Sequence, residues 1–165
     1  MEYAIYTDGA CRGNPGPGGY GVVVIDQKNN CIIKTFSETC LNTTNNREEL
    51  KAIIKAFEII NELQLEGKNI CIFSDSAYAV NMINNWIWTW AKNNWKNSKK
   101  KEVENIDLVK IIFNYINKNY FDCQVKKING HAGILGNELA DALATSNFDK
   151  YSSIFKNSIL DTLDE

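Results

Sequence analysis

The feature that most constrains the fold is a glycine-rich segment at residues 2–24, with the sequence EYAIYTDGACRGNPGPGGYGVVV. An apolar run at residues 3–6 has the composition of a buried strand and leads into Asp8. Six of the ten glycines and both prolines follow between residues 9 and 21, and a second strand pattern occupies residues 20–25. The pattern predicts two strands joined by a wide turn. Asp8 is therefore either a turn residue that caps its own backbone or a functional carboxylate at the end of a central strand.

Hydrophobic periodicity predicts the remaining elements. These are strands at residues 31–40, 70–73 and 121–128, and helical segments at residues 47–60, 78–82, 103–116 and 137–144. Three strands joined by hairpin-like turns, followed by alternating helices and strands, indicate an α/β fold. We expect a five-stranded mixed sheet, antiparallel at one side and parallel at the other, flanked by helices. The predicted domain spans residues 1–147, and a tail at residues 148–165 is expected to pack on it or to be partly disordered.

Composition narrows the class of protein. A chain of 165 residues with 44% hydrophobic residues is long enough to bury a core as one domain. It has neither an N-terminal signal pattern nor an apolar run of the roughly 18 residues that a membrane helix needs. Five cysteines without paired metal-ligand spacing indicate reduced thiols. We expect a cytoplasmic, monomeric protein without a membrane partner.

Four acids are expected to meet in this fold. Asp8 and Asp75 each follow a predicted strand, Glu48 or Glu49 begins a helix, and Asp141 lies on the last helix. Carboxylates brought together repel one another, so a cluster must be protonated or bind cations. An all-oxygen site favours Mg²⁺ or Mn²⁺, and the single histidine excludes a histidine-rich zinc site. Each acid taken alone also has a simpler explanation, as a surface carboxylate or a helix cap.

Helix geometry separates the two adjacent glutamates. Glu49 lies on the same stripe as Ile53, which is predicted to face the sheet. Glu48 lies on the stripe of Lys51 and Lys55 and is expected to face solvent in surface ion pairs. Glu49 is therefore the predicted ligand.

Charge and aromatic residues concentrate at residues 76–101. This stretch contains no acid, although the whole chain has a net charge of −2. It holds five lysines beside all four tryptophans of the chain: Lys92, Lys96, Lys99, Lys100, Lys101, Trp86, Trp88, Trp90 and Trp95. The stretch is either a solvated lysine face over a tryptophan core or, as we expect from the local excess of positive charge, a phosphate-binding surface.

Five motifs in order resemble type 1 ribonuclease H of the bacterial cellular class. They are YTDGACRGNPGPGGYG, NTTNNREEL, FSDSAYAV, WIWTWAKNNWK and NGHAGILGNELADALA, which cover most of residues 3–145. The resemblance implies a ribonuclease H-like fold and endonucleolytic hydrolysis of the RNA strand of RNA–DNA hybrids. It also implies two Mg²⁺ ions per active site, with products that carry 5′-phosphate and 3′-hydroxyl ends.

The resemblance assigns roles to individual residues. The metal-binding catalytic acids would be Asp8, Glu49, Asp75 and Asp141, and the auxiliary catalytic residue would be His131. Contacts to the RNA strand would fall on Gly9, Asn14 and Asn46, and a pocket for a DNA phosphate would include Thr44 and Asn45. Residues 76–101 would form a protruding basic handle that grips the hybrid, with Trp86 and the five lysines as its candidate contacts.

One motif position departs from the family. Ala77 stands two residues after Asp75, where many relatives carry glutamine, so one contact to the RNA strand is expected to be missing. Two other functions remain compatible with the acids. One is another polynucleotidyl transferase of the same fold, such as an integrase or a junction resolvase; the other is a non-catalytic module that binds hybrids.

Overall fold

The structure is a computed structural model that describes residues 1–118, 123–130 and 132–145. The predicted auxiliary residue His131 and the predicted tail at residues 148–165 lie outside these ranges.

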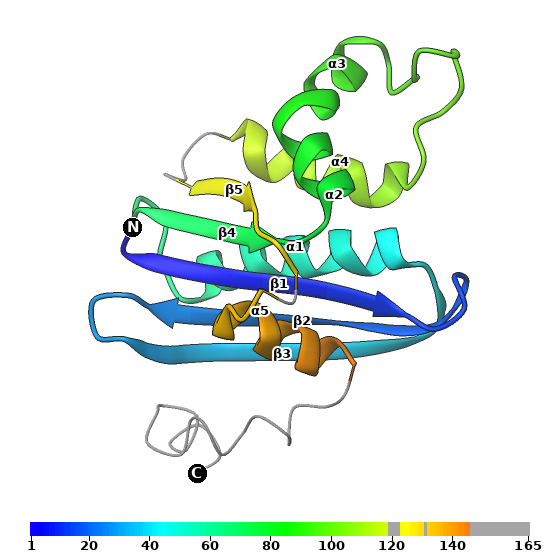
Figure 1. The fold of residues 1–165 in the computed structure, drawn as a ribbon. Coiled ribbons are helices and arrows are strands. Elements are labelled where there is room, and N and C mark those ends of the chain that lie inside the picture. The colour runs from blue at the N-terminus through cyan, green and yellow to red at the C-terminus, as the bar shows by residue number, and fades with distance from the viewer. Residues whose placement is uncertain (119–122, 131, 146–165) are drawn as a thin grey trace.

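A five-stranded mixed sheet forms the centre of the molecule (Figure 1). Its strands are β1 (Tyr3–Cys11), β2 (Gly16–Asp26), β3 (Cys31–Thr43), β4 (Ile70–Ser74) and β5 (Cys123–Lys127). They lie in the order β3-β2-β1-β4-β5. The pairs β3–β2 and β2–β1 are antiparallel, whereas β1–β4 and β4–β5 are parallel. The predicted fold class is confirmed.

Most of the glycine-rich segment forms strands, whereas a wide turn was expected. β2 begins at Gly16 rather than at residue 20, so the connection after β1 is confined to residues 12–15. A Cβ atom at Gly21 would lie 2.5 Å from the carbonyl oxygen of Ala140, and one at Gly18 would lie 2.5 Å from that of Ala10. These glycines are therefore needed for close packing within and onto the sheet rather than for turn flexibility.

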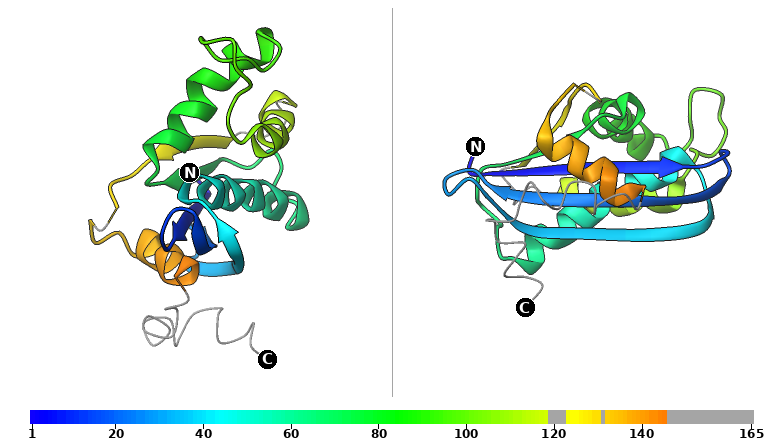
Figure 2. Two further views of the ribbon diagram at one scale, coloured as in Figure 1. Left: turned by 90° about the vertical axis from the view of Figure 1, so that its right-hand side faces the viewer. Right: turned by 60° about the horizontal axis from the view of Figure 1, so that its bottom comes forward.

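Two helices cover opposite faces of the sheet, as the end-on view in Figure 2 shows. They are α1 (Asn45–Glu62) and α5 (Leu135–Ala144). The larger core cluster lies on the α1 side, and a smaller one, including Val23, Ile32 and Leu139, lies under α5. Burial of these apolar side chains is the main force that fixes both helices on the sheet. Within the described residues, no helix combines the length and apolarity required to cross a membrane.

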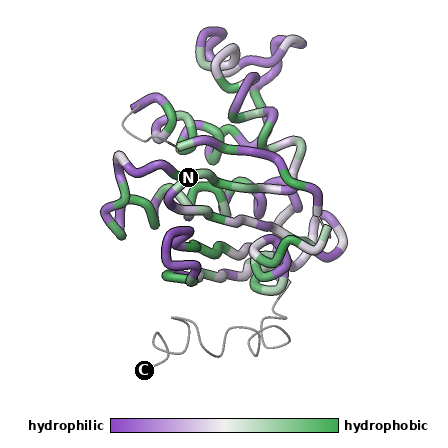
Figure 3. The backbone as a smooth tube through the Cα atoms, turned by 60° about the vertical axis from the view of Figure 1, so that its left-hand side comes forward, coloured by the Kyte–Doolittle hydropathy of each residue, from purple (hydrophilic) through white to green (hydrophobic). Residues whose placement is uncertain are grey.

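Three consecutive helical segments leave the sheet after β4: α2 (Ala77–Asn81), the π-helical η1 (Met82–Trp86) and α3 (Ile87–Lys92). They rise away from the sheet and end in an extended loop that returns to α4 (Ile106–Asn117) (Figures 1 and 2). The lysine-bearing loop at the top of Figure 3 is hydrophilic, whereas much of the sheet below it is hydrophobic. Residues 76–101 thus form a protrusion, which we call the basic handle.

The helix boundaries differ from the predicted ones for local reasons. α1 begins two residues early because the Thr44 hydroxyl oxygen accepts a hydrogen bond from the Arg47 N–H at 3.2 Å and caps the helix. α4 begins three residues late because the Val103 N–H donates to the Trp95 carbonyl at 3.1 Å and Asn105 adopts a left-handed φ of 57°. α5 begins at Leu135 rather than at residue 137.

Candidate active site

Three acids converge beside the C-terminal end of β4. β1 and β4 are parallel neighbours whose last paired residues are Thr7 and Ser74, so Asp8 and Asp75 lie at the same level. Asp75 follows β4 as predicted, but Asp8 does not follow its strand, because β1 continues to Cys11 by pairing with β2. Glu49 reaches them from α1. One carboxylate oxygen from each of the three lies within 4.8 Å of the others. The predicted convergence of these acids is confirmed.

Gly9 explains why Glu49 can approach so closely. A Cβ atom at Gly9 would lie 2.4 Å from the Glu49 backbone nitrogen, so only glycine lets the first turns of α1 pack directly on β1. The Gly9 N–H also donates a hydrogen bond to the Glu49 carboxylate, which helps to hold the side chain toward Asp8.

Asp141 completes the group from the opposite face of the sheet. It projects from α5, is half-buried, and lies within hydrogen-bonding reach of the Asp8 carboxyl group. α5 comes this close because Gly136 packs on the ring of Tyr6, where a Cβ atom would overlap the ring. The structure therefore brings all four predicted acids together.

Burial and repulsion by neighbouring charges disfavour ionisation of Asp8 and Glu49. Asp8 is only 4% exposed, and its burial, followed by the charges of Glu49 and Asp75, raises its pKa to about 10. Burial, and then the charge of Asp75, raises the pKa of Glu49 to about 8, even though hydrogen bonds from Asp8 and Gly9 oppose the shift. A bound cation would oppose both pKa shifts, because it would interact favourably with the ionised carboxylates.

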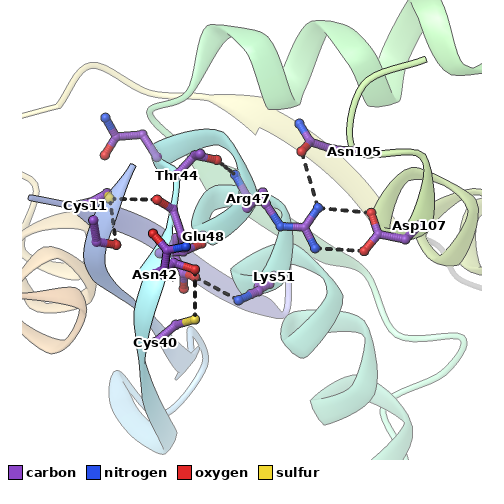
Figure 4. Close-up of polar contacts among 12 residues, drawn as sticks. Cys11, Cys40, Asn42, Thr44, Arg47, Glu48, Lys51, Asn105 and Asp107 are labelled. Atoms are coloured by element: carbon purple, nitrogen blue, oxygen red, sulfur yellow. Dashed lines mark hydrogen bonds and ion pairs between the residues drawn. The ribbon is translucent and has the colours of Figure 1, made fainter. Parts of the chain in front are cut away.

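The expectation that Glu48 faces solvent is wrong. Its side chain is 1% exposed, because the first turn of α1 lies so close to β1 that the Glu48 Cβ would contact a Cβ at Gly9. Lys51 donates a hydrogen bond to Glu48 Oε1 at 2.9 Å, so the predicted pair forms, but at a buried position (Figure 4). Lys55 pairs instead with Glu58 at 2.8 Å. Glu48 does not belong to the group of oxygens around Asp8.

A second feature lies at the N-terminal end of α1, where several predicted hybrid contacts meet. Asn14 Oδ1 accepts a hydrogen bond from the Asn45 N–H at 2.9 Å, which joins the turn after β1 to the helix. Asn14, Thr44 and Asn46 line a pocket of about 400 Å³. Gly9 lies under α1 at the acid cluster rather than in this pocket.

Two residues of this pocket, Glu104 and Asn105, were missed from the sequence. Glu104 and Asn105 lie beside α1 because the Arg47 guanidinium donates two hydrogen bonds to Asp107, at 2.7 and 3.0 Å, and one to Asn105 at 3.4 Å (Figure 4). These contacts fix the start of α4 beside the start of α1. No local sequence pattern predicts this pairing, because Arg47 and Asp107 are sixty residues apart in the sequence.

Asn137 is a further polar residue near the acids that was not selected from the sequence. It is 2% exposed, and its Nδ2 has no hydrogen-bond partner within the described part of the chain. It stands one helical turn before Asp141, so both lie on the same side of α5. The spacing of four residues from Asp141 is the sequence feature that could have identified Asn137.

The basic handle presents its cations to solvent. Lys92, Lys96, Lys99, Lys100 and Lys101 are exposed, and among the described residues none forms an ion pair with an acid. Trp90 and Trp95 pack against the core, whereas Trp86 and Trp88 are 42% and 41% exposed. The handle therefore combines solvent-exposed lysines with a partial tryptophan core. Ala77 is exposed at the start of α2, two residues from Asp75.

Comparisons with known proteins agree with this arrangement. The RNase H family model matches residues 1–149. Ribonuclease H of Caldicellulosiruptor saccharolyticus is 43% identical over 146 residues, which cover 88% of this chain and 94% of the relative. Ribonuclease H of Syntrophomonas wolfei is 44% identical over 144 residues, with coverage of 87% and 93%.

Solved structures show the same fold. LC11-RNase H1 in complex with an RNA/DNA hybrid has a TM-score of 0.67 and 28% identity, covering 91% of this chain and 99% of that one. LC9-RNase H1, described as a type 1 RNase H with the type 2 active-site motif, has a TM-score of 0.74 and 29% identity, with coverage of 90% and 72%. The chain therefore belongs to the ribonuclease H family, in its type 1 class.

Proposed function

We propose that the protein cleaves the RNA strand of RNA–DNA hybrids internally, as a monomer, with two divalent cations, and leaves 5′-phosphate and 3′-hydroxyl ends. The observation that carries the proposal is the buried group formed by Asp8, Glu49 and Asp75, with Asp141 beside it. Membership in the ribonuclease H family supports the choice of substrate.

The donor atoms of the cluster suit Mg²⁺ or Mn²⁺. All are carboxylate oxygens, and Glu49 Oε2 is buried without a hydrogen-bond partner in the described part of the chain. Among the described residues, no lysine or arginine forms an ion pair with Asp8, Glu49, Asp75 or Asp141. When bound, the two ions would supply a water of lowered pKa and neutralise charge on the leaving 3′-oxygen.

The protein's own groups position the substrate around the acids. The cations would be held by Asp8 on β1, Glu49 on α1, Asp75 after β4 and Asp141 on α5. The chain that carries His131 passes Asp75 at Gly130, where a Cβ atom would lie 2.8 Å from Asp75 Oδ2. We assign His131 the role of moving a proton or assisting product release, since a histidine titrates near neutral pH.

The remaining contacts select the hybrid. Gly9, Asn14 and Asn46 are proposed to recognise the RNA strand, whose 2′-hydroxyls distinguish it from DNA. The pocket at the start of α1, with Thr44 and Asn45, is proposed to take a phosphate of the DNA strand. That pocket lies at the N-terminal end of an 18-residue helix, where the helix dipole and free N–H groups favour an anion.

The basic handle is proposed to grip the backbone of the hybrid with its five lysines, while the exposed ring of Trp86 packs against it.

A cleavage assay with three labelled substrates tests this function. We expect Mg²⁺-dependent cutting of the RNA strand in an RNA–DNA hybrid, and no cutting of duplex DNA or single-stranded RNA. Cleavage of duplex DNA would favour another polynucleotidyl transferase of this fold. Tight hybrid binding without cleavage in Mg²⁺ or Mn²⁺ would make the protein a binding module.

A further inference from the structure

The pocket at the N-terminal end of α1 contains an acid where the proposed function places a phosphate. Glu104 lines this pocket together with Asn14, Thr44, Asn46 and Asn105. We propose that Glu104 weakens binding of the DNA-strand phosphate in this pocket. It would thereby lower the affinity of the enzyme for its hybrid and alter how that affinity depends on salt concentration. This inference rests on the proposed function and concerns the affinity of the same enzyme for its substrate.

The other groups in the pocket are suited to an anion. The Asn45 N–H can only donate, so the atom of Asn14 that faces it at 2.9 Å is Oδ1, and the Nδ2 donor of Asn14 remains available. Thr44 and Asn46 lie at the positive end of the α1 dipole. Without Glu104, the pocket would be neutral, rich in donors and attractive to a phosphate.

No cation among the described residues that line the pocket offsets the charge of Glu104, since none of them is lysine or arginine. The nearby guanidinium of Arg47 is bound by both carboxylate oxygens of Asp107, at 2.7 and 3.0 Å. Its charge is therefore largely neutralised outside the pocket. Glu104 is the charged side chain of the described lining.

The position of Glu104 is fixed by its neighbours in sequence. Val103 is buried and donates its N–H to the Trp95 carbonyl at 3.1 Å. Asn105 donates from Nδ2 to the Tyr78 hydroxyl at 3.3 Å and accepts from Arg47. Glu104 lies between these two anchored residues, so its backbone is held at the pocket and a phosphate that enters there is repelled by its negative charge.

The test is the affinity of Glu104→Gln for a fluorescent RNA–DNA hybrid, measured by anisotropy in EDTA so that no cleavage occurs. Gln keeps the shape of the side chain and removes its charge. We expect about three- to tenfold tighter binding at low salt, the size of effect given by removing one repulsive charge at a protein surface, and a gain that fades as salt screens the charge. The matched control is Glu66→Gln, which removes an exposed charge from the loop after the C-terminal end of α1 and should leave affinity unchanged.

A second set of hybrids locates the effect. Each carries one neutral methylphosphonate in the DNA strand, and at the linkage that occupies the pocket the parent and Glu104→Gln should bind equally. An unchanged or weaker affinity of Glu104→Gln, an equal gain in Glu66→Gln, or a gain that persists at every neutralised linkage would overturn the inference. These outcomes are distinct from failure of the proposed function, in which the parent itself would not cleave hybrids.

Discussion

Glu48 and Glu49 both occupy buried positions at the start of α1, but only Glu49 joins the oxygens around Asp8. We predict that Glu49→Gln reduces cleavage by about a hundredfold or more, the order expected when one electrostatic interaction with the transition state is removed. Glu48→Gln should stay within a few-fold of the parent in rate. Its hydrogen bond with Lys51 loses the carboxylate charge, which should lower the free energy of unfolding by about 1 kcal/mol.

Single-turnover cleavage and urea unfolding of the two variants check this prediction. An inactive Glu48→Gln beside an active Glu49→Gln would contradict the assignment of the metal ligand.

The acid cluster also predicts how stability depends on pH. The pKa values of Asp8 and Glu49 are raised in the folded protein to about 10 and about 8, so the folded state binds more protons than the unfolded state from about pH 4 to about pH 10. The stabilisation is complete below the unfolded pKa values and is lost as pH rises through the folded ones. In EDTA, we therefore expect a lower Tm at pH 8 than at pH 5.5. Mg²⁺ should raise the Tm more at pH 8, because it binds the deprotonated carboxylates.

Asp8→Asn is the control for this pH dependence. It removes one of the interacting carboxyl groups, so its metal-free Tm should fall less between pH 5.5 and pH 8. An equal fall in the parent and in Asp8→Asn would assign the pH dependence to groups outside the cluster.

At the level of secondary-structure elements, hydrophobic periodicity and the expected alignment of parallel strands predicted most of the fold. The five strands, the sheet-facing side of Glu49 and the position of Asp75 follow from local patterns that the structure preserves. Asp8 was expected after the first strand but lies within it, because the glycines of β2 extend the pairing to Cys11. The misplaced start of β2 has one cause: glycine was taken as a turn residue, but Gly18 and Gly21 stand in a strand because neighbouring backbone leaves no room for a Cβ. The burial of Glu48 has a related cause. Its position around the helix predicted exposure to solvent, but Gly9 lets α1 approach the sheet so closely that this side chain is buried as well.

The basic handle is the element whose function depends on net charge rather than on geometry. Lys99→Ala with Lys100→Ala should weaken hybrid binding and reduce the slope of log affinity against log salt by about 0.9 for each phosphate that the lysines no longer neutralise. The rate at saturating substrate should change little, because neither lysine lies at the acid cluster. Anisotropy titrations from low to high salt measure the slope.

The control for the handle replaces two lysines at the opposite end of the sheet. Lys28 and Lys68 are also exposed, and their neighbours in sequence pair with the first residues of β1 rather than with the region of Asp8. Lys28→Ala with Lys68→Ala should leave the slope unchanged. Equal slopes for both double variants would mean that the handle lysines are an ordinary solvated surface.

At the scale of the whole molecule, the sheet brings two sites to one side of the protein. The acids lie where the pairing of β1 with β4 ends, and the pocket forms where α1 and α4 begin. The first site was predictable because parallel strands align their ends. The second was not, since it depends on the long-range pairing of Arg47 with Asp107, for which the sequence has no periodic signal.

We propose that these acids direct water, rather than the RNA's own 2′-hydroxyl, at the phosphodiester bond. Cleavage of an RNA–DNA hybrid in H₂¹⁸O with Mg²⁺, followed by mass spectrometry of both strands, distinguishes the two nucleophiles. We predict an intact DNA strand and RNA fragments with one ¹⁸O in a new 5′-phosphate and an unlabelled 3′-hydroxyl. Fragments ending in a 2′,3′-cyclic phosphate, or a cut DNA strand, would contradict the account.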